Sequence, residues 1–199
     1  MKKTLYLMRH AQTLFNVQHR IQGWCDSPLT ELGKKQAVRA GEFFARNGIQ
    51  PDHFYCSTSE RCSDTLELAM GDVPYTRSKG LKEWNFGTVE GESERLNPPL
   101  PYGDFFQKYY HGETEQEVGE RVAAALAQIM AKPDHEVVLA VSHGASCACF
   151  MRCWQKKQRC ELVRPKGGML NCTIFEYEYE DGEFSLVAVH FPDFSDLTD

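Results

Sequence analysis

The chain contains 199 residues, of which 42% are hydrophobic and 25% are charged. This length and composition suit one compact globular domain with its own core, and they exclude the disordered and fibrous classes. The 22 Lys and Arg residues are outnumbered by 28 Asp and Glu, which gives a net charge of -6 and argues against general binding of nucleic acid or anionic membranes.

The first part of the chain alternates between strand and helix signals. Short apolar runs predict buried strands, and amphipathic stretches that follow Ser or Thr and end at Gly or Asn-Gly predict helices. In chain order, we expect a strand at 4–8, a long loop at 16–28, a helix at 30–46, a strand at 54–56, and a helix capped by Ser57 or Ser59 that runs to Met70.

The second part of the chain is less regular at its start. Residues 72–92 show no clear period, and the prolines of residues 97–101 exclude regular helix there. After these, we expect a short segment at 104–110, a helix at 115–131, a strand at 136–141, a helix from Gly144 to about Lys157, and a hairpin of residues 173–179 and 184–190 around Asp181-Gly182.

This order of elements predicts an α/β fold. We expect a three-layer domain with a mostly parallel central sheet flanked by helices and an antiparallel hairpin at one edge. Residues 1–199 are expected to form a single domain, with a small lid insertion at about residues 92–112.

The sequence also predicts a cellular location for the protein and a redox state for its cysteines. No apolar run is long enough to span a membrane, and the N-terminal apolar stretch breaks at Arg9 and His10, so we expect a cytoplasmic protein without a membrane partner. Eight cysteines then read as reduced thiols. Cys147, Cys149 and Cys153 suggest a metal cluster, but helical residues two apart do not share a face, so we interpret them as structural thiols and expect no metal.

Charged and titratable side chains follow the predicted strands. His10 ends the first strand, His143 ends the strand at 136–141, and Arg61 opens the helix after the second strand. Each of these residues, like Arg9, is more often structural when it occurs alone. Together, at the carboxyl edge of a parallel sheet, they favour a cationic, donor-rich site that suits a phosphoryl group.

Five segments resemble motifs of the histidine phosphatase superfamily, and they occur in the same order as in that family. The superfamily has the phosphoglycerate-mutase-like fold. The resemblance covers about the first three quarters of the chain. The matching segments are Leu7-Met8-Arg9-His10-Ala11-Gln12-Thr13 with Asn16, the stretch 22–37 that begins Gln22-Gly23-Trp24, the stretch 57–65 with Arg61, the stretch 81–91 with Glu83, and Val141-Ser142-His143-Gly144.

The resemblance implies a role for each matching position. His10 would be the nucleophile that receives the phosphoryl group, and Glu83 would be the general acid. Around them, the phosphoryl oxygens would be held by Arg9, Arg61 and His143, and the substrate would be bound by Asn16, Gln22, Gly23 and Gly144.

Elementary chemistry agrees with these implied roles. Positive charge is needed around a phosphomonoester dianion, and His10 must present a neutral nitrogen while an acceptor such as a backbone carbonyl holds the other ring nitrogen. Glu83 must be protonated to assist the leaving oxygen, and a bound dianion favours that form. Its rivals as the acid are nearby carboxylates: Glu31, Glu60, Glu90 and Glu92.

One residue departs from the family pattern. Ala11 stands where the family usually has glycine. If this position needs a positive φ, alanine strains the site. Because the surrounding motifs are intact, we nevertheless expect an active enzyme.

Three functions remain open at this stage. Residues 92–112 carry only Arg95 and Lys108 as Lys or Arg cations and have no arginine pair, whereas the resemblance gives true mutases a paired-arginine insertion. This favours a metal-independent phosphatase of small phosphorylated metabolites, with no cofactor. The alternatives are a cofactor-dependent phosphoglycerate mutase and a non-catalytic phosphate-binding protein. The oligomeric state is left open.

Overall fold

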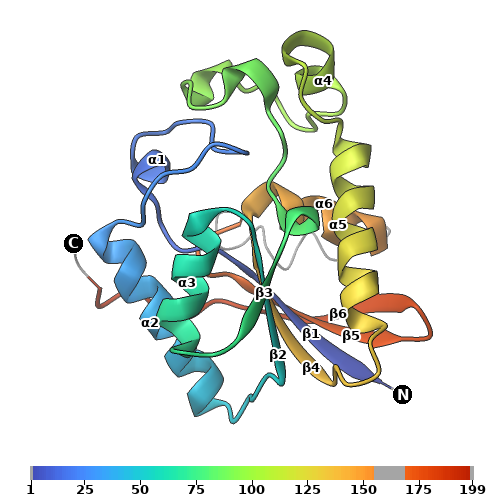
Figure 1. Cartoon of the computed structure of the whole chain (residues 1–199). Coiled ribbons are helices and arrows are strands. Elements are labelled where there is room, and N and C mark those ends of the chain that lie inside the picture. The colour runs from blue at the N-terminus through green and yellow to red at the C-terminus, as the bar shows by residue number, and fades with distance from the viewer. Residues whose placement is uncertain (1, 155–168, 198–199) are drawn as a thin grey trace.

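A computed structural model describes residues 2–154 and 169–197 (Figure 1). The described strands form one six-stranded sheet in the order β3-β2-β4-β1-β5-β6. They are β1 Lys3–Arg9, β2 His53–Ser57, β3 Tyr75–Ser78, β4 Val137–Ser142, β5 Ile174–Glu180 and β6 Glu183–His190. The α-helices in these ranges are α1 Leu14–Val17, α2 Glu31–Arg46, α3 Glu60–Met70, α4 Phe105–Tyr110, α5 Glu115–Met130 and α6 Gly144–Trp154.

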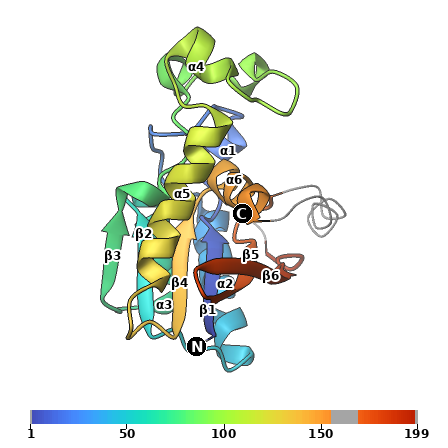
Figure 2. The same cartoon turned by 90° about the vertical axis from the view of Figure 1, so that its right-hand side faces the viewer.

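The expected three-layer α/β fold is confirmed. β1 and β2 each pair with β4 in parallel, β3 pairs with β2 in parallel, and β5 and β6 form the antiparallel edge. Helices α2 and α3 cover one face of the sheet, and α5 and α6 cover the other (Figures 1 and 2).

The central strand β1 shows why the fold needs both helical layers. Its side chains alternate between the two faces, as the period of a strand requires. Leu5 and Leu7 belong to the core under α5 and α6, whereas Tyr6 and Met8 belong to the core under α2 and α3. Burying an apolar side chain of this size stabilises the fold by about 1.5–3 kcal/mol, so this strand depends on both layers.

The predicted helix ends rest on local chemistry. The Thr30 side chain accepts a hydrogen bond from the Gly33 amide (2.9 Å), which caps α2 as expected. Thr114 and Glu117 form a reciprocal capping box at the start of α5. At the predicted hairpin, Asp181 and Gly182 both adopt positive φ, as a tight two-residue turn requires.

Three local predictions differ from the structure or fall outside it. Strand β3 was not expected, because it is an edge strand with no buried residue and therefore carries no alternating pattern. The short helix α1 replaces the start of the predicted loop, capped by Thr13 and Asn16. The expected end of the last helix near Lys157 lies outside the described residues, which stop at Trp154 on this side.

Residues 79–112 lie beyond the carboxyl ends of the parallel strands (Figure 1). They contain three 3-10 turns, Lys79–Leu81, Gly87–Val89 and Glu94–Leu96, and the helix α4. Phe106 of α4 is fully buried and packs its ring against Trp84 and Phe86. This aromatic contact holds α4 against the loop that carries Glu83.

A helix that crosses a membrane must be both long and apolar. Within residues 2–154 and 169–197, no helix is both long and apolar enough to do so.

Candidate active site

The register of the parallel strands brings the two histidines together. Arg9 of β1 pairs with Ser142 of β4, so the residues that follow them, His10 and His143, leave the sheet side by side. Their ring centroids are 5.3 Å apart with an interplanar angle of 66°. Both side chains are buried, and the predicted convergence of strand-end histidines is therefore present.

The His10 ring is oriented by a backbone carbonyl. Its Nδ1 donates to the Ala11 carbonyl at 2.7 Å, which leaves Nε2 as the unprotonated nitrogen. Burial, followed by the positive charges of Arg61 and Arg9, holds the pKa of His10 well below its usual range. This neutral, oriented imidazole is the form that nucleophilic attack requires.

Ala11 fits the backbone without strain. It is not among the residues with positive φ, so this site does not need glycine's conformational freedom. Its amide donates to Thr65 Oγ1 at 3.0 Å, and its methyl group packs in the core under α2 and α3.

Two guanidinium groups flank the histidines: Arg61 is fully buried and Arg9 is partly buried. Arg9 Nη1 donates to the Met169 carbonyl, and the Nη atoms of Arg61 donate to backbone carbonyls and to Asp26 Oδ1 (2.8 Å). The Nε of each arginine is also buried, and neither has a hydrogen-bond partner among the residues that the structure describes. An unmade buried hydrogen bond is costly, so these donors fit an anionic group bound beside His10.

His143 is held as a neutral side chain. Its Nε2 lies 2.8 Å from Ser57 Oγ and 3.5 Å from Cys62 Sγ. Burial, and then the charge of Arg61, keeps the pKa of His143 well below its usual range. The ring therefore offers a hydrogen bond rather than a positive charge.

Glu83 is buried at the start of α6. Its carboxylate accepts hydrogen bonds from the Trp84, Ala145 and Ser146 amides at 2.8–3.0 Å and from the Ser146 hydroxyl at 3.0 Å. The first amides of a helix have no hydrogen-bond partner within the helix, so they favour an acidic side chain at this point.

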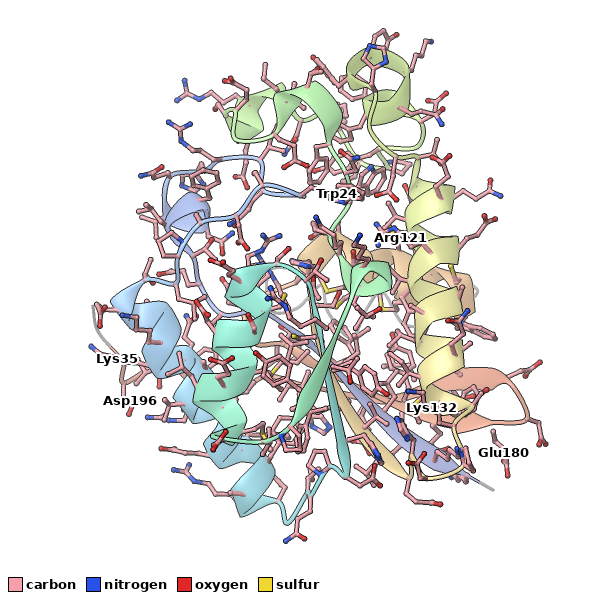
Figure 3. The ribbon with its side chains drawn as sticks, in the orientation of Figure 1. Trp24, Lys35, Arg121, Lys132, Glu180 and Asp196 are labelled. Carbon is pink, nitrogen blue, oxygen red and sulfur yellow. The ribbon has the colours of Figure 1, made fainter. Side chains whose placement is uncertain are left out.

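The backbone of the Glu83 loop is held by Arg121 of α5 (Figure 3). Its guanidinium pairs with the Glu113 carboxylate and donates to the carbonyls of Gly80, Lys82 and Glu83 at 2.9–3.1 Å. The fork geometry of arginine allows all of these contacts at once. Nothing in the sequence pattern of the α5 helix marks Arg121 for this role.

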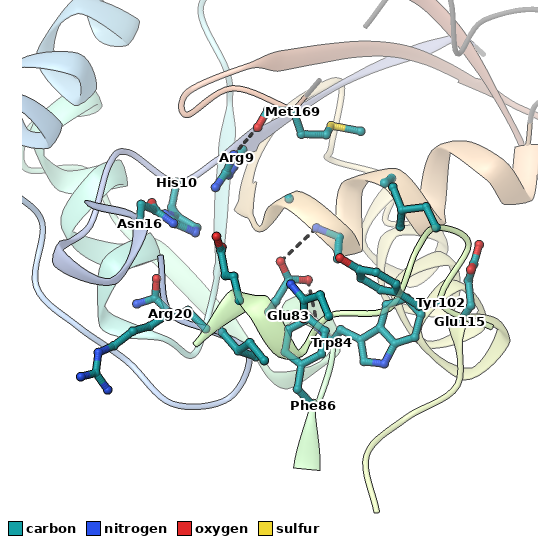
Figure 4. Close-up of a pocket in the computed structure, with 18 of the residues that line it drawn as sticks. Arg9, His10, Asn16, Arg20, Glu83, Trp84, Phe86, Tyr102, Glu115 and Met169 are labelled. Carbon is teal, nitrogen blue, oxygen red and sulfur yellow. Dashed lines mark hydrogen bonds between the residues drawn. The ribbon is translucent and has the colours of Figure 1, made fainter. Parts of the chain in front are cut away.

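Arg9, His10 and Glu83 open onto one pocket of about 310 Å³ (Figure 4). Six of the predicted site residues line it: Arg9, His10, Asn16, Gln22, Glu83 and Gly144. Arg61 and His143 are fully buried and do not line it, and Gly23 does not line it either. The pocket also contains residues that the sequence did not single out as site residues: Arg20, Ile21, Trp84, Phe86, Glu94, Asn97, Leu100, Tyr102, Glu115, Ala145, Ala148, Arg152 and Met169.

Two of the predicted substrate-binding side chains, Asn16 and Gln22, make hydrogen bonds within the protein. Asn16 Oδ1 accepts from the Thr13 amide (3.1 Å), and the Gln22 side chain accepts from the Thr13 hydroxyl (2.7 Å). A Cβ on Gly23 would lie only 2.1 Å from the Trp84 carbonyl oxygen, so glycine is needed there for close packing. A Cβ on Gly144 would lie 3.3 Å from Arg9 Nε.

The rival carboxylates lie elsewhere. Glu31, Glu60 and Glu92 are exposed and do not line the pocket. Glu90 also lies outside the pocket lining, and its carboxylate accepts four backbone hydrogen bonds. Of the glutamates considered from the sequence, the structure therefore places only Glu83 in the pocket with His10.

Within the described residues, the one group able to supply three metal ligands is His53, Asp134 and His135. It lies at the opposite, amino edge of the parallel strands. Its ring nitrogens already have partners: His53 Nδ1 is 2.8 Å from Asp52, and His135 lies 2.9 Å from Asp134 and 2.8 Å from the Tyr55 hydroxyl. Cys147, Cys149 and Cys153 are not part of this group.

The chain as a whole is similar to known proteins. The family model described as "Histidine phosphatase superfamily (branch 1)" matches residues 5–191. The chain belongs to this superfamily. Among its curated relatives, a "Probable phosphoglycerate mutase GpmB" from Salmonella arizonae is 32% identical, covering 90% of this chain and 86% of the relative.

Solved structures are also similar to the chain. YhfR of Bacillus stearothermophilus is 30% identical with a TM-score of 0.78, covering 94% of this chain and 96% of that chain. A phosphoserine phosphatase mutant from Entamoeba histolytica, in complex with phosphoserine, is 25% identical with a TM-score of 0.76 and the same coverage. The names of the relatives and structural neighbours thus include both a mutase and a phosphatase.

The lowered pKa of His10 predicts a specific pH dependence. The ring stays neutral at pH values where an ordinary imidazole, with a pKa of about 6.5, is already protonated. We expect kcat/KM, corrected for ionisation of the substrate phosphate, to show no acid limb near pH 6.5. A loss of activity that titrates at that pH would contradict this assignment.

A control separates this effect from unfolding. Two buried neutral histidines bind fewer protons in the native state than in the unfolded state, so stability falls as the pH drops below about 6.5. The thermal midpoint is therefore measured at each pH, and only points from folded protein are used.

Proposed function

We propose that this protein is a metal-independent phosphatase that hydrolyses small phosphomonoesters through a phosphohistidine intermediate on His10. The observation that carries the proposal is the pairing of an oriented neutral imidazole with the buried Nε donors of Arg9 and Arg61, which have no hydrogen-bond partner among the described residues. A phosphoryl group satisfies those donors and presents its phosphorus to His10 Nε2.

In the first step, the lone pair of His10 Nε2 forms a bond to phosphorus while the bond from phosphorus to the ester oxygen breaks. Glu83, acting as a carboxylic acid, gives its proton to the departing oxygen. The guanidinium groups of Arg9 and Arg61 stabilise the charge on the equatorial oxygens, and His143 donates a hydrogen bond.

In the second step, water attacks the phosphorus of the phosphohistidine. Glu83 now accepts a proton from that water, the bond between nitrogen and phosphorus breaks, and the electron pair returns to His10 Nε2. Inorganic phosphate leaves, and both side chains regain their starting protonation. His, Arg and Glu side chains suffice for each transfer, so the proposed mechanism requires no metal.

The substrate's leaving group would occupy the outer part of the pocket. Residues 92–112 would act there as a lid, contributing Asn97, Leu100 and Tyr102 to the lining. The aromatic residues of the lid have two roles. Phe106 packs into the core, whereas Tyr102 faces the pocket (Figure 4). A volume of about 310 Å³ suits a small metabolite.

A specific observation also supports the mutase alternative. Arg20 and Arg152 line the pocket although neither belongs to residues 92–112. Arg152 is paired with Glu115 of the same lining at 2.7 Å, so Arg20, which donates to the Gly91 carbonyl, is the cation that would hold a second anionic group on a phosphorylated acid. The names of the curated relatives agree with this alternative.

A parallel assay distinguishes the two activities. Purified protein is incubated with a panel of phosphorylated metabolites, and phosphate release and mutase turnover are measured side by side with and without a chelator. We expect phosphate release to dominate and to survive chelation. Mutase turnover far above phosphate release would establish the alternative, and activity lost to chelation and restored by a divalent ion would contradict the mechanism.

The substitution His10→Ala tests the nucleophile. It should abolish turnover and the acid-labile transfer of ³²P from substrate to protein. The thermal midpoint should change by no more than about 5 °C, because a strand-end side chain contributes little to the core. Turnover retained by a folded variant would remove His10 as the nucleophile, whereas a wild-type protein that binds phosphate without turnover or labelling would be a binding protein.

The substitution Glu83→Gln tests the general acid. Glutamine keeps the size of the side chain but has no acidic proton to donate, so kcat/KM for an alkyl phosphate should fall by roughly 10²–10⁴-fold. The loss should be much smaller on p-nitrophenyl phosphate, whose leaving group needs little protonation. Glu92→Gln, at an exposed carboxylate of the same region, is the matched control, and equal losses on the two esters would show that Glu83 acts only in binding or structure.

A further inference from the structure

Glu90 makes an unusual set of contacts for a carboxylate outside the pocket. Its Oε2 accepts from the amides of Gly23 (2.9 Å) and Cys25 (3.1 Å). Its Oε1 accepts from the amides of Trp24 (2.7 Å) and Phe86 (3.0 Å). Three consecutive amides of the loop at residues 22–25 therefore converge on one carboxylate.

The carbonyl groups of the same loop point to Arg61. Arg61 Nη2 lies 2.9 Å from the Gly23 oxygen and 3.5 Å from the Gln22 oxygen, and Nη1 donates to the Cys25 oxygen at 3.0 Å. Asp26 Oδ1 completes this set at 2.8 Å. Both Nη atoms are thus committed to the loop, and only Nε is left without a partner among the described residues.

Single peptide units connect the two charged groups. The unit between Gly23 and Trp24 gives its carbonyl to Arg61 and its amide to Glu90, and the unit between Gln22 and Gly23 is placed in the same way. A peptide group is positive at its N–H and negative at its C=O. Each of these dipoles is therefore aligned between a carboxylate and a guanidinium, which stabilises this orientation of the loop.

The loop at residues 22–25 is closely packed against Glu90 and Trp84. A Cβ on Gly23 would lie 2.4 Å from Glu90 Oε1 as well as against the Trp84 carbonyl. Glu90 is half-buried, and Arg61 is fully buried, so their interaction with the peptide dipoles is screened less than it would be at the surface.

We propose that Glu90 is a positioning residue that orients Arg61 for phosphoryl binding through the peptide groups of residues 22–25. This inference rests on the proposed function of the pocket. Without the Glu90 carboxylate, the three amides lose their shared acceptor and the loop turns, so its carbonyls no longer hold the Arg61 fork in place. The phosphoryl group then loses a correctly placed cation, although Glu90 never touches the substrate.

The substitution Glu90→Gln keeps the size of the side chain but places an NH₂ group where a backbone amide needs an acceptor. We expect the Kd of inorganic phosphate, measured by calorimetry, to rise by about 10-fold or more. The loss in kcat/KM should be equal on alkyl and p-nitrophenyl phosphates. Glu92→Gln should change neither quantity by more than about 2-fold.

A double-substitution cycle tests whether Glu90 acts through Arg61. Arg61→Lys keeps the charge but loses the fork that the loop carbonyls hold. The Kd of phosphate for the protein with both Glu90→Gln and Arg61→Lys should lie within about 3-fold of that for Arg61→Lys alone, because the second change removes what the first one disturbs. Glu90→Asp, which keeps the charge on a shorter side chain, should fall between the wild type and Glu90→Gln.

The outcomes separate this inference from the proposed function. If Glu90→Gln is folded and binds phosphate as the wild type does, or if the losses multiply in the double variant, the inference is overturned. A loss on alkyl phosphate alone would also overturn it, because Glu90 would then be acting as an acid. A wild-type protein that binds phosphate without hydrolysing any ester would overturn the phosphatase proposal alone. If Glu90→Gln does not fold, the same cycle is run with Glu90→Asp.

Discussion

The placement of two guanidinium groups, one fully buried and one partly buried, beside two histidines is the constraint on which the rest of the site depends. A buried charge is tolerated only when it is paired and hydrogen-bonded. Arg61 meets this requirement with carbonyls of residues 22–25 and with Asp26, and Arg9 uses the Met169 carbonyl. The two arginines therefore hold the loop at residues 22–25 and Met169 in place.

The same charges determine the chemistry of the histidines. Burial and the nearby arginines keep both rings neutral, and a backbone carbonyl selects which nitrogen of His10 is free. Glu83 has further support from the first amides of α6 and from the Arg121 fork. The loop at 22–25 joins this support, because Trp24 Nε1 donates to the Glu83 carbonyl at 3.0 Å, so the surroundings of the nucleophile and of the carboxylate are connected.

Much of the fold and part of the site could be predicted from the sequence. Strands that end in histidine, helices with clear caps and the Asp181-Gly182 hairpin all carry local signals, and each is present. Strand β3 carries no such signal because it is an exposed edge. The contacts of Arg121 and Glu90 could not be predicted, since they join segments 38–41 and 65–67 residues apart and no periodicity records such a pairing. Arg20 and Arg152 reach the pocket from outside the segment that the sequence suggested.

The strand order has a consequence for synthesis of the chain. β1 is made first, but both of its neighbours, β4 and β5, come from residues after 136. Its main-chain groups have no sheet partner until residues beyond 136 have been translated, and His10 cannot meet His143 before then. Contacts this distant in sequence form slowly. A nascent chain on a ribosome therefore lacks the paired histidines until β4 has emerged, and its first strand stays without either neighbour for most of the residues that separate β1 from β4.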